Sequence, residues 1–205
     1  MIKFDNTFYD LESDIKSFLE EQHTQVQVPY TVNIDCNGET SVTTNDSASM
    51  YRWSINTQLL DNRFSSLIEK SPEMMHIALT GINYDKRSVL DLGCGFCQYW
   101  PFLEAYGFNE FVGIDLYKLR GYGDQLCFET ASELVVKFCK TSKVDIYEID
   151  VRQIDGIIKK DRKFDLIFTK STNNTKLGST GIPRDLFDKV VRDRLSKGGI
   201  AIYNG

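Results

Sequence analysis

The hydrophobic pattern changes once within the first 43 residues. Apolar residues at helical spacing predict a helix in the first 25 residues: Phe8, Leu11, Ile15, Phe18 and Leu19. From Val26 to Ile34 apolar positions alternate with polar ones, which predicts a strand. Asn37-Gly38 is a dipeptide typical of tight turns, so residues 27–43 are expected to form a small antiparallel hairpin.

Two more helices are predicted before residue 81. Ser47 or Ser49 can cap a helix whose apolar positions continue to Ile68. A second, short helix is predicted over 73–80. Residues 1–80 are therefore expected to form an N-terminal extension made of a helix, a hairpin and cap helices.

After residue 87 short apolar runs alternate with helical segments, which is the pattern of a parallel sheet covered by helices. The predicted strands are apolar on both faces, as buried strands are, and cover 88–92, 110–115, 144–149, 164–169 and 199–203. The predicted helices between them cover 98–106, 129–141, 151–159 and 183–195. The last helix has Pro183 near its first turn and Gly198 just beyond its end, the usual asymmetry of helix termini. The sequence predicts an α/β fold with a doubly wound, mainly parallel sheet over residues 81–205.

Net charge and composition disfavour two classes of partner, nucleic acids and membranes. Among 205 residues, 24 Lys and Arg stand against 29 Asp and Glu, a net charge of −5. That sign disfavours nucleic acid as a partner, because nucleic-acid binding relies on basic side chains that contact phosphates. No apolar run approaches the roughly 20 residues that span a bilayer, and the start of the chain lacks the features of a signal peptide. A cytoplasmic protein without a membrane partner is expected, with its five cysteines reduced.

The stretch "SVLDLGCGFCQYW" joins the first sheet strand to the next helix, and several interpretations of it are open. Its glycines suit a sharply turning loop that a cofactor approaches closely. Cys94 and Cys97 have the spacing of a redox or zinc site, although zinc needs two more ligands and no second such pair is present. The cysteines can also be incidental residues at a strand end. An NAD-type loop requires G-x-G-x-x-G, and Gln98 stands at the third glycine.

Two aspartates follow this loop in the sequence, each at the end of a predicted strand. Asp115 ends the second predicted strand twenty residues after Gly95, where a carboxylate can accept hydrogen bonds from both hydroxyls of a ribose. Asp150 ends the third strand in "YEIDVRQI", although an Asp before a helix is also a plain N-cap. A glycine loop followed in order by both acidic strand ends favours a nucleotide-type cofactor.

Residues 88–205 resemble the class I S-adenosylmethionine-dependent methyltransferases, which have a Rossmann-like fold. Five segments carry the resemblance in the family's order: "VLDLGCGFC", "FVGIDLY", "YEIDVRQI", "FDLIFTKS" and "RLSKGGIAIYNG". The resemblance implies S-adenosyl-L-methionine as cofactor and S-adenosyl-L-homocysteine as product. It also implies a cofactor site of nine residues: Asp91, Gly93, Cys94, Gly95, Asp115, Leu116, Asp150, Val151 and Thr169.

At the methionine end of the cofactor, the resemblance gives each residue the role of the matching family position. Gly93, Cys94 and Gly95 would cradle the methionine part mostly through backbone groups. Asp91 would balance the positive amino group or sulfonium. Thr169 would face the methionine end beside the methyl group.

At the nucleoside end, the resemblance implies that Asp115 holds the ribose hydroxyls and that Leu116 lies against the adenine. Asp150 and the backbone of Val151 match the place where the family pairs with the adenine amino group.

The sequence departs from the family pattern in two places. Cys97 replaces the third glycine, which in the family lies in the first turn of the helix, and a small residue there is expected to be tolerated. The sequence given ends at Gly205, whereas the family fold continues through another helix and an antiparallel pair of strands. The fifth strand would then be an exposed edge, which proteins normally cover. Either the sequence belongs to a truncated or unusually short member, or the N-terminal hairpin or a partner subunit, for instance in a homodimer, covers this strand.

The resemblance implies an enzyme that transfers a methyl group in line to a small molecule or a protein side chain. Such a reaction depends on alignment and exclusion of water, so no catalytic residue is assigned from the sequence, and no metal is expected. Two alternatives stay open: an S-adenosylmethionine-binding regulatory or partner-dependent subunit that transfers nothing, and an NAD-type oxidoreductase.

Overall fold

The computed structural model describes residues 6–25, 31–34, 40–43, 87–116, 124–170 and 182–204. The helices predicted between residues 47 and 80, and the boundary between residues 80 and 81, lie outside this described part of the chain.

The N-terminal elements follow the hydrophobic pattern. Helix α1 covers Asn6–Gln25, and strands β1 (Thr31–Ile34) and β2 (Thr40–Thr43) pair antiparallel, so the predicted helix and hairpin are confirmed. The Asn-Gly turn itself lies outside the described residues. The side chains of Ile15 and Phe18 on α1 belong to the same core as the sheet that follows.

The sheet has five strands, all parallel, in the order β5-β4-β3-β6-β7. Their bounds are Ser88–Leu92 for β3, Glu110–Asp115 for β4, Val144–Glu148 for β5, Phe164–Lys170 for β6 and Leu195–Asn204 for β7. The first strand of the sheet lies at its centre, and the chain adds strands first on one side and then on the other. This is the predicted doubly wound arrangement.

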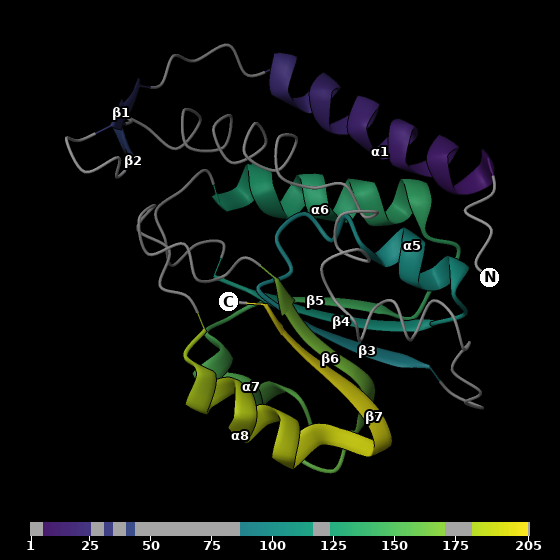
Figure 1. Ribbon diagram of the computed structural model, residues 1–205, viewed down its shortest axis with the longest axis vertical. Helices are drawn as coiled ribbons and strands as arrows, with labels where there is room; N and C mark the ends of the chain where they lie inside the picture. The colour runs from purple at the N-terminus through teal and green to yellow at the C-terminus, as the bar shows by residue number, and fades with distance from the viewer. Residues whose placement is uncertain are drawn as a thin grey trace.

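Helices cover both faces of this sheet (Figure 1). On one face lie α1, α5 and α6, and on the other lie α7 and α8. Their bounds are Trp100–Ala105 for α5, Asp124–Phe138 for α6, Ile154–Ile157 for α7 and Arg184–Arg194 for α8, with a 3₁₀ turn, η2, over Val151–Gln153. Two helices differ clearly from their predicted bounds: α6 begins before residue 129 and ends before residue 141, and the helix expected over 151–159 is a 3₁₀ turn followed by one short α-helix.

Alternate residues of the central strands point to the two faces. Val89 and Phe111 pack in the core under α1, α5 and α6, whereas Leu90 and Val112 pack in the core that faces α7 and α8. All four side chains are fully buried. The apolar character of both faces of these strands is therefore explained by two separate cores.

The beginning of β7 differs from the prediction. Phe164 pairs with Leu195, but Leu166 pairs with Ile200, so β7 carries a bulge between these pairs. Gly198 lies in this bulge with a φ of 80°, and it does not end α8, which stops at Arg194. The strand was predicted to start at residue 199 because the bulge interrupts its apolar run.

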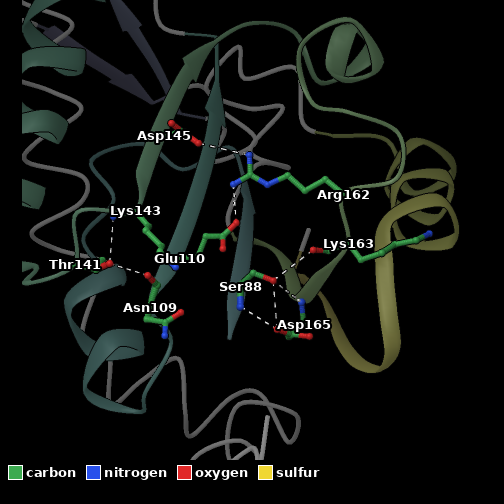
Figure 2. Close-up of polar contacts among 9 residues, drawn as sticks. All are labelled: Ser88, Asn109, Glu110, Thr141, Lys143, Asp145, Arg162, Lys163 and Asp165. Atoms are coloured by element: carbon green, nitrogen blue, oxygen red, sulfur yellow. Dashed lines mark hydrogen bonds and ion pairs between the residues drawn. The ribbon is translucent and has the colours of Figure 1, made fainter. Parts of the chain in front are cut away.

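Side chains link the strands at their amino ends (Figure 2). The Asp165 carboxylate, at the start of β6, accepts a hydrogen bond of 2.9 Å from the backbone N–H of Ser88, the first residue of β3. Arg162 forms ion pairs with Glu110 of β4 at 2.8 Å and with Asp145 of β5 at 3.5 Å. These contacts fix the strands relative to one another at the edge opposite the candidate site.

Candidate functional site

The predicted site residues lie near the end of β3 and on the loop after it, and at or just beyond the ends of β4, β5 and β6. Since all these strands are parallel, their carboxyl ends lie at one edge of the sheet, which is where ligands bind in this kind of fold. The register places Asp115 opposite Glu148, two residues before Asp150. On the other side of β3, Asp91 pairs with Phe168, the residue before Thr169.

The glycine loop turns sharply after β3 and is attached to β4. Gly93 and Gly95 have φ angles of 79° and 52°, a region that favours glycine. The N–H groups of Gly93 and Cys94 donate to the carbonyl of Ile114 at 2.7 and 3.2 Å. A Cβ added at Gly95 would have no heavy atom of the described residues within 4 Å, so this part of the chain leaves the loop uncovered there.

Asp115 connects the loop to the end of β4. Its Oδ2 accepts a hydrogen bond of 2.8 Å from the N–H of Gly95, and its Oδ1 accepts one of 2.6 Å from the N–H of Leu116. Both residues that it contacts are only partly buried. A carboxylate offers about four acceptor positions, so this group can also accept hydroxyl donors from a bound molecule.

Asp91 lies beneath the loop at the end of β3 and is only 2% exposed. Its Oδ2 accepts a hydrogen bond of 2.9 Å from the indole Nε1 of Trp100. Burial raises the pKa of this carboxyl to about 8; the charge of Asp115 also raises it, and the bond from Trp100 lowers it. A cation beside Asp91 would stabilise the ionised form.

Two residues that shape the site were not singled out from the sequence. Trp100 is fully buried and stacks on Phe111, with ring centroids 5.3 Å apart. Gly113 leaves room for this arrangement, because a Cβ there would lie 2.7 Å from the Sγ of Cys94 and 2.8 Å from Cζ2 of Trp100. A glycine inside a strand was the available sequence signal, since it often marks a close approach.

Asp150 acts as an N-cap. Its carboxylate accepts hydrogen bonds from the backbone N–H of Arg152 at 2.8 Å and from the Nε of the same residue at 2.9 Å. These contacts with Arg152 lower the pKa of Asp150. The prediction that Asp150 is an N-cap is therefore confirmed. Any ligand at Asp150 would share its carboxylate with Arg152. The side chain of Val151 is buried, which leaves its backbone as the group available to a ligand.

Thr169 is fully buried in β6, where it pairs with Tyr203 of β7. Leu116 is half-buried directly after β4. The structure thus places both residues at the same edge of the sheet as the glycine loop.

The two cysteines of the loop are buried thiols that are not joined in a disulfide. Burial raises the pKa of Cys97 well above its usual value, and its hydrogen bond with Cys94 adds to the effect, so the reactive thiolate is disfavoured. Within the described ranges, no group of three or more His, Cys, Asp or Glu side chains is placed to hold a metal ion. The packing of these cysteines favours a structural role.

Cys97 has a φ of 57° and lies in the turn before α5, not in the first helical turn where the family glycine was expected. Replacing Cys97 by glycine should relieve the backbone strain, which stabilises the fold, and remove a fully buried side chain, which destabilises it. Each effect changes the free energy of unfolding by about 1 to 2 kcal/mol, with opposite sign. We expect Cys97→Gly to change the free energy of unfolding by less than about 1 kcal/mol, measured by urea denaturation. A loss well above that value would contradict this balance.

The arrangement of sheet, loop and carboxylates defines a doubly wound α/β protein with a ligand site after its central strand. No protein-family model matches the sequence, and no curated protein is similar to it in sequence. A solved structure of a candidate S-adenosyl-L-methionine-dependent methyltransferase from Methanococcus maripaludis superposes with a TM-score of 0.51 at 14% identity, over 80% of this chain and 65% of that one. This chain thus spans less than two thirds of the length of that protein.

Two further solved structures are similar at lower scores. An S-adenosylmethionine-dependent methyltransferase from Clostridium acetobutylicum gives a TM-score of 0.45 at 18% identity, over 73% of this chain and 54% of that one. A SAM-dependent methyltransferase from Thiobacillus denitrificans, in complex with S-adenosyl-L-homocysteine, gives 0.44 at 18% identity, over 69% and 54%.

The Methanococcus structure and the strand order together show that this chain has the Rossmann-like fold of the class I S-adenosylmethionine-dependent methyltransferases. The fold class expected from the sequence is confirmed. In the part of the chain that the structure describes, no helix combines the length and apolar character needed to cross a membrane.

Proposed function

We propose that this protein binds S-adenosyl-L-methionine at the loop after β3 and transfers its methyl group to a small molecule or a protein side chain. The observation that carries the proposal is the Asp115 carboxylate, which accepts a hydrogen bond from the backbone of Gly95 at the carboxyl edge of the sheet, where no described residue covers the loop. A carboxylate in this place suits the two neighbouring hydroxyls of a ribose.

The residues present fit this cofactor along its length. Asp115 would hold the ribose, while Asp150 and the backbone of Val151, with the half-buried Leu116, would border the adenine. The loop from Gly93 to Gly95 would carry the methionine part, with Asp91 as the negative charge beneath it. When bound, the cofactor supplies a methyl group on a sulfonium, which is already a good leaving group.

The work of the chain is then alignment and exclusion of water. The loop is held by hydrogen bonds to Ile114 and Asp115, so the methionine end would be placed on a fixed backbone. A base is required only where the acceptor atom must lose a proton. We assign no residue to that role, and the nature of the acceptor belongs to the proposal.

The proposal is tested first by calorimetry with S-adenosyl-L-homocysteine and with NAD. We expect the thioether to bind and NAD not to bind. Tight binding of NAD without binding of the thioether would overturn the proposal and leave the oxidoreductase alternative.

The second measurement is transfer of a radiolabelled methyl group to a panel of small molecules and peptides. Labelling of one acceptor class is expected. Binding of the thioether with no transfer to any member of a broad panel would instead favour a regulatory or partner-dependent subunit.

A further inference from the structure

We propose that Trp100 is a positioning residue for the methionine end of the cofactor: its indole N–H holds the Asp91 carboxylate in place beneath the glycine loop. The inference rests on the proposed function, because it assigns a role within the same site. It concerns a contact between a helix and a strand of this chain and not a further residue that touches the cofactor.

Trp100 is held from several sides. It is fully buried, it stacks on Phe111 at an interplanar angle of 20°, and its ring lies over the missing Cβ of Gly113. Its backbone N–H donates to the carbonyl of Cys97 at 3.1 Å, which ties the start of α5 to the glycine loop. An indole fixed in this way can aim its N–H in only one direction, and that direction is the Oδ2 of Asp91 at 2.9 Å.

The hydrogen bond acts on the charge of Asp91 as well as on its position. Among the described residues, the titratable groups that interact with this carboxyl are Asp115, whose charge disfavours its ionisation, and the thiol of Cys97. Burial is the main reason why the pKa of Asp91 is raised to about 8, and the bond from Trp100 is the interaction that opposes it. Without the indole N–H the carboxyl would be neutral over a wider pH range and a weaker partner for an ammonium group.

The pH dependence of binding follows from this. A ligand with a positive amino group favours ionised Asp91, so binding should release a proton at pH values below about 8. The affinity for S-adenosyl-L-homocysteine should therefore rise about fivefold between pH 7 and pH 8, and by about a further twofold at most above pH 8. Methylthioadenosine, which lacks the amino acid part, should bind with little pH dependence over the same range. Calorimetry in buffers of different ionisation enthalpy measures both the affinity and the released proton.

The central experiment is Trp100→Phe, which keeps an aromatic ring against Phe111 but removes the donor. We expect a loss of about tenfold in affinity for S-adenosyl-L-homocysteine at pH 7, with the midpoint of its pH dependence moved upward. The affinity for methylthioadenosine should change by less than about twofold. Phe111→Leu is the matched control, because it disturbs the same packing and leaves the N–H in place, so it should not move the midpoint.

A second readout needs no cofactor. The protein has two tryptophans, Trp53 and Trp100, so the indole N–H resonance that remains in the spectrum of Trp53→Phe is that of Trp100. In the free wild-type protein this resonance should titrate together with Asp91. If Trp100→Phe does not fold, Asp91→Asn replaces it: the resonance should then no longer titrate, and thioether binding should lose its pH dependence.

The outcomes separate the inference from the proposed function. If the wild-type protein binds no thioether at any pH, the proposed function fails and the inference with it. If the wild-type protein binds it, but Trp100→Phe or Asp91→Asn leaves both the affinity and the pH dependence unchanged, the inference alone is overturned. Trp100 is then a packing residue of the core.

Discussion

Replacing Asp115 by alanine is expected to weaken the binding of S-adenosyl-L-homocysteine by about 100-fold or more. The carboxylate accepts hydrogen bonds from the backbone of Gly95 and of Leu116, so its loss removes both the acceptor for the ribose and the attachment of the loop to β4. A hydrogen bond to a charged group contributes about 1.5 to 3 kcal/mol, and two of them account for a loss of this size. Calorimetry measures the loss, and circular dichroism establishes that the variant is folded.

Asp115→Asn sharpens this experiment. Asparagine keeps the shape and one acceptor oxygen but presents an amide group to one of the two backbone donors. We expect a loss of about tenfold, between wild type and Asp115→Ala. Asp145→Asn is the matched control, because Asp145 is an acidic residue of the neighbouring strand that pairs with Arg162 at the opposite edge of the sheet. Affinity retained in Asp115→Ala would show that the site has been placed wrongly.

The central strands could be predicted to the residue. The bounds of β3 and β4 agree with the prediction, because each is a short run that is apolar on both faces and ends at a glycine or an aspartate. The place of the candidate site could also be predicted from the order of the glycine loop, Asp115 and Asp150 along the chain, because parallel strands bring their carboxyl ends to one edge of the sheet. These are properties of the backbone and of local sequence.

The contacts beneath the loop could not be predicted in the same way. Trp100 reads as an ordinary apolar residue of an amphipathic helix, and only the packing of α5 onto the sheet brings its N–H to Asp91. The ion pair between Asp150 and Arg152 depends on the side-chain conformation of an exposed arginine. The bulge of β7 depends on its pairing with β6. The Trp100 contact and the bulge are set by tertiary structure, and the Asp150 contact by a side-chain conformation. Hydrophobic periodicity predicts none of the three.

Replacing Arg194 by alanine is the change for which we expect the largest loss of stability. Arg194 ends α8 and is only 1% exposed, which is rare for an arginine. Its guanidinium donates to the carbonyls of Lys159 and Ile158 at 2.8 and 2.9 Å and to the carboxylate of Asp155 at 2.7 Å. The side chain therefore joins α8 to the end of α7.

The expected loss is about 3 kcal/mol in the free energy of unfolding, measured by urea denaturation at pH 7. Removal of Arg194 leaves the carbonyls of Lys159 and Ile158 without this donor and opens a space in the core beneath α8. Arg194→Lys should fall between wild type and alanine, because an ammonium group keeps the charge but lacks the planar fork that reaches several acceptors at once.

The loss should also depend on pH. The hydrogen bond from Arg194 is the main reason why the pKa of Asp155 is lowered. This pair therefore stabilises the folded state at pH values above the usual pKa of an aspartate. The stabilisation is lost as the pH falls through the lowered pKa of Asp155. The difference between wild type and Arg194→Ala should thus be largest near neutral pH and smaller below about pH 4. Arg192→Ala, an exposed position on the same helix, should change stability by no more than about 0.5 kcal/mol. An equal effect of the two substitutions would mean that the charge of α8, and not the buried contacts of Arg194, stabilises this part of the fold.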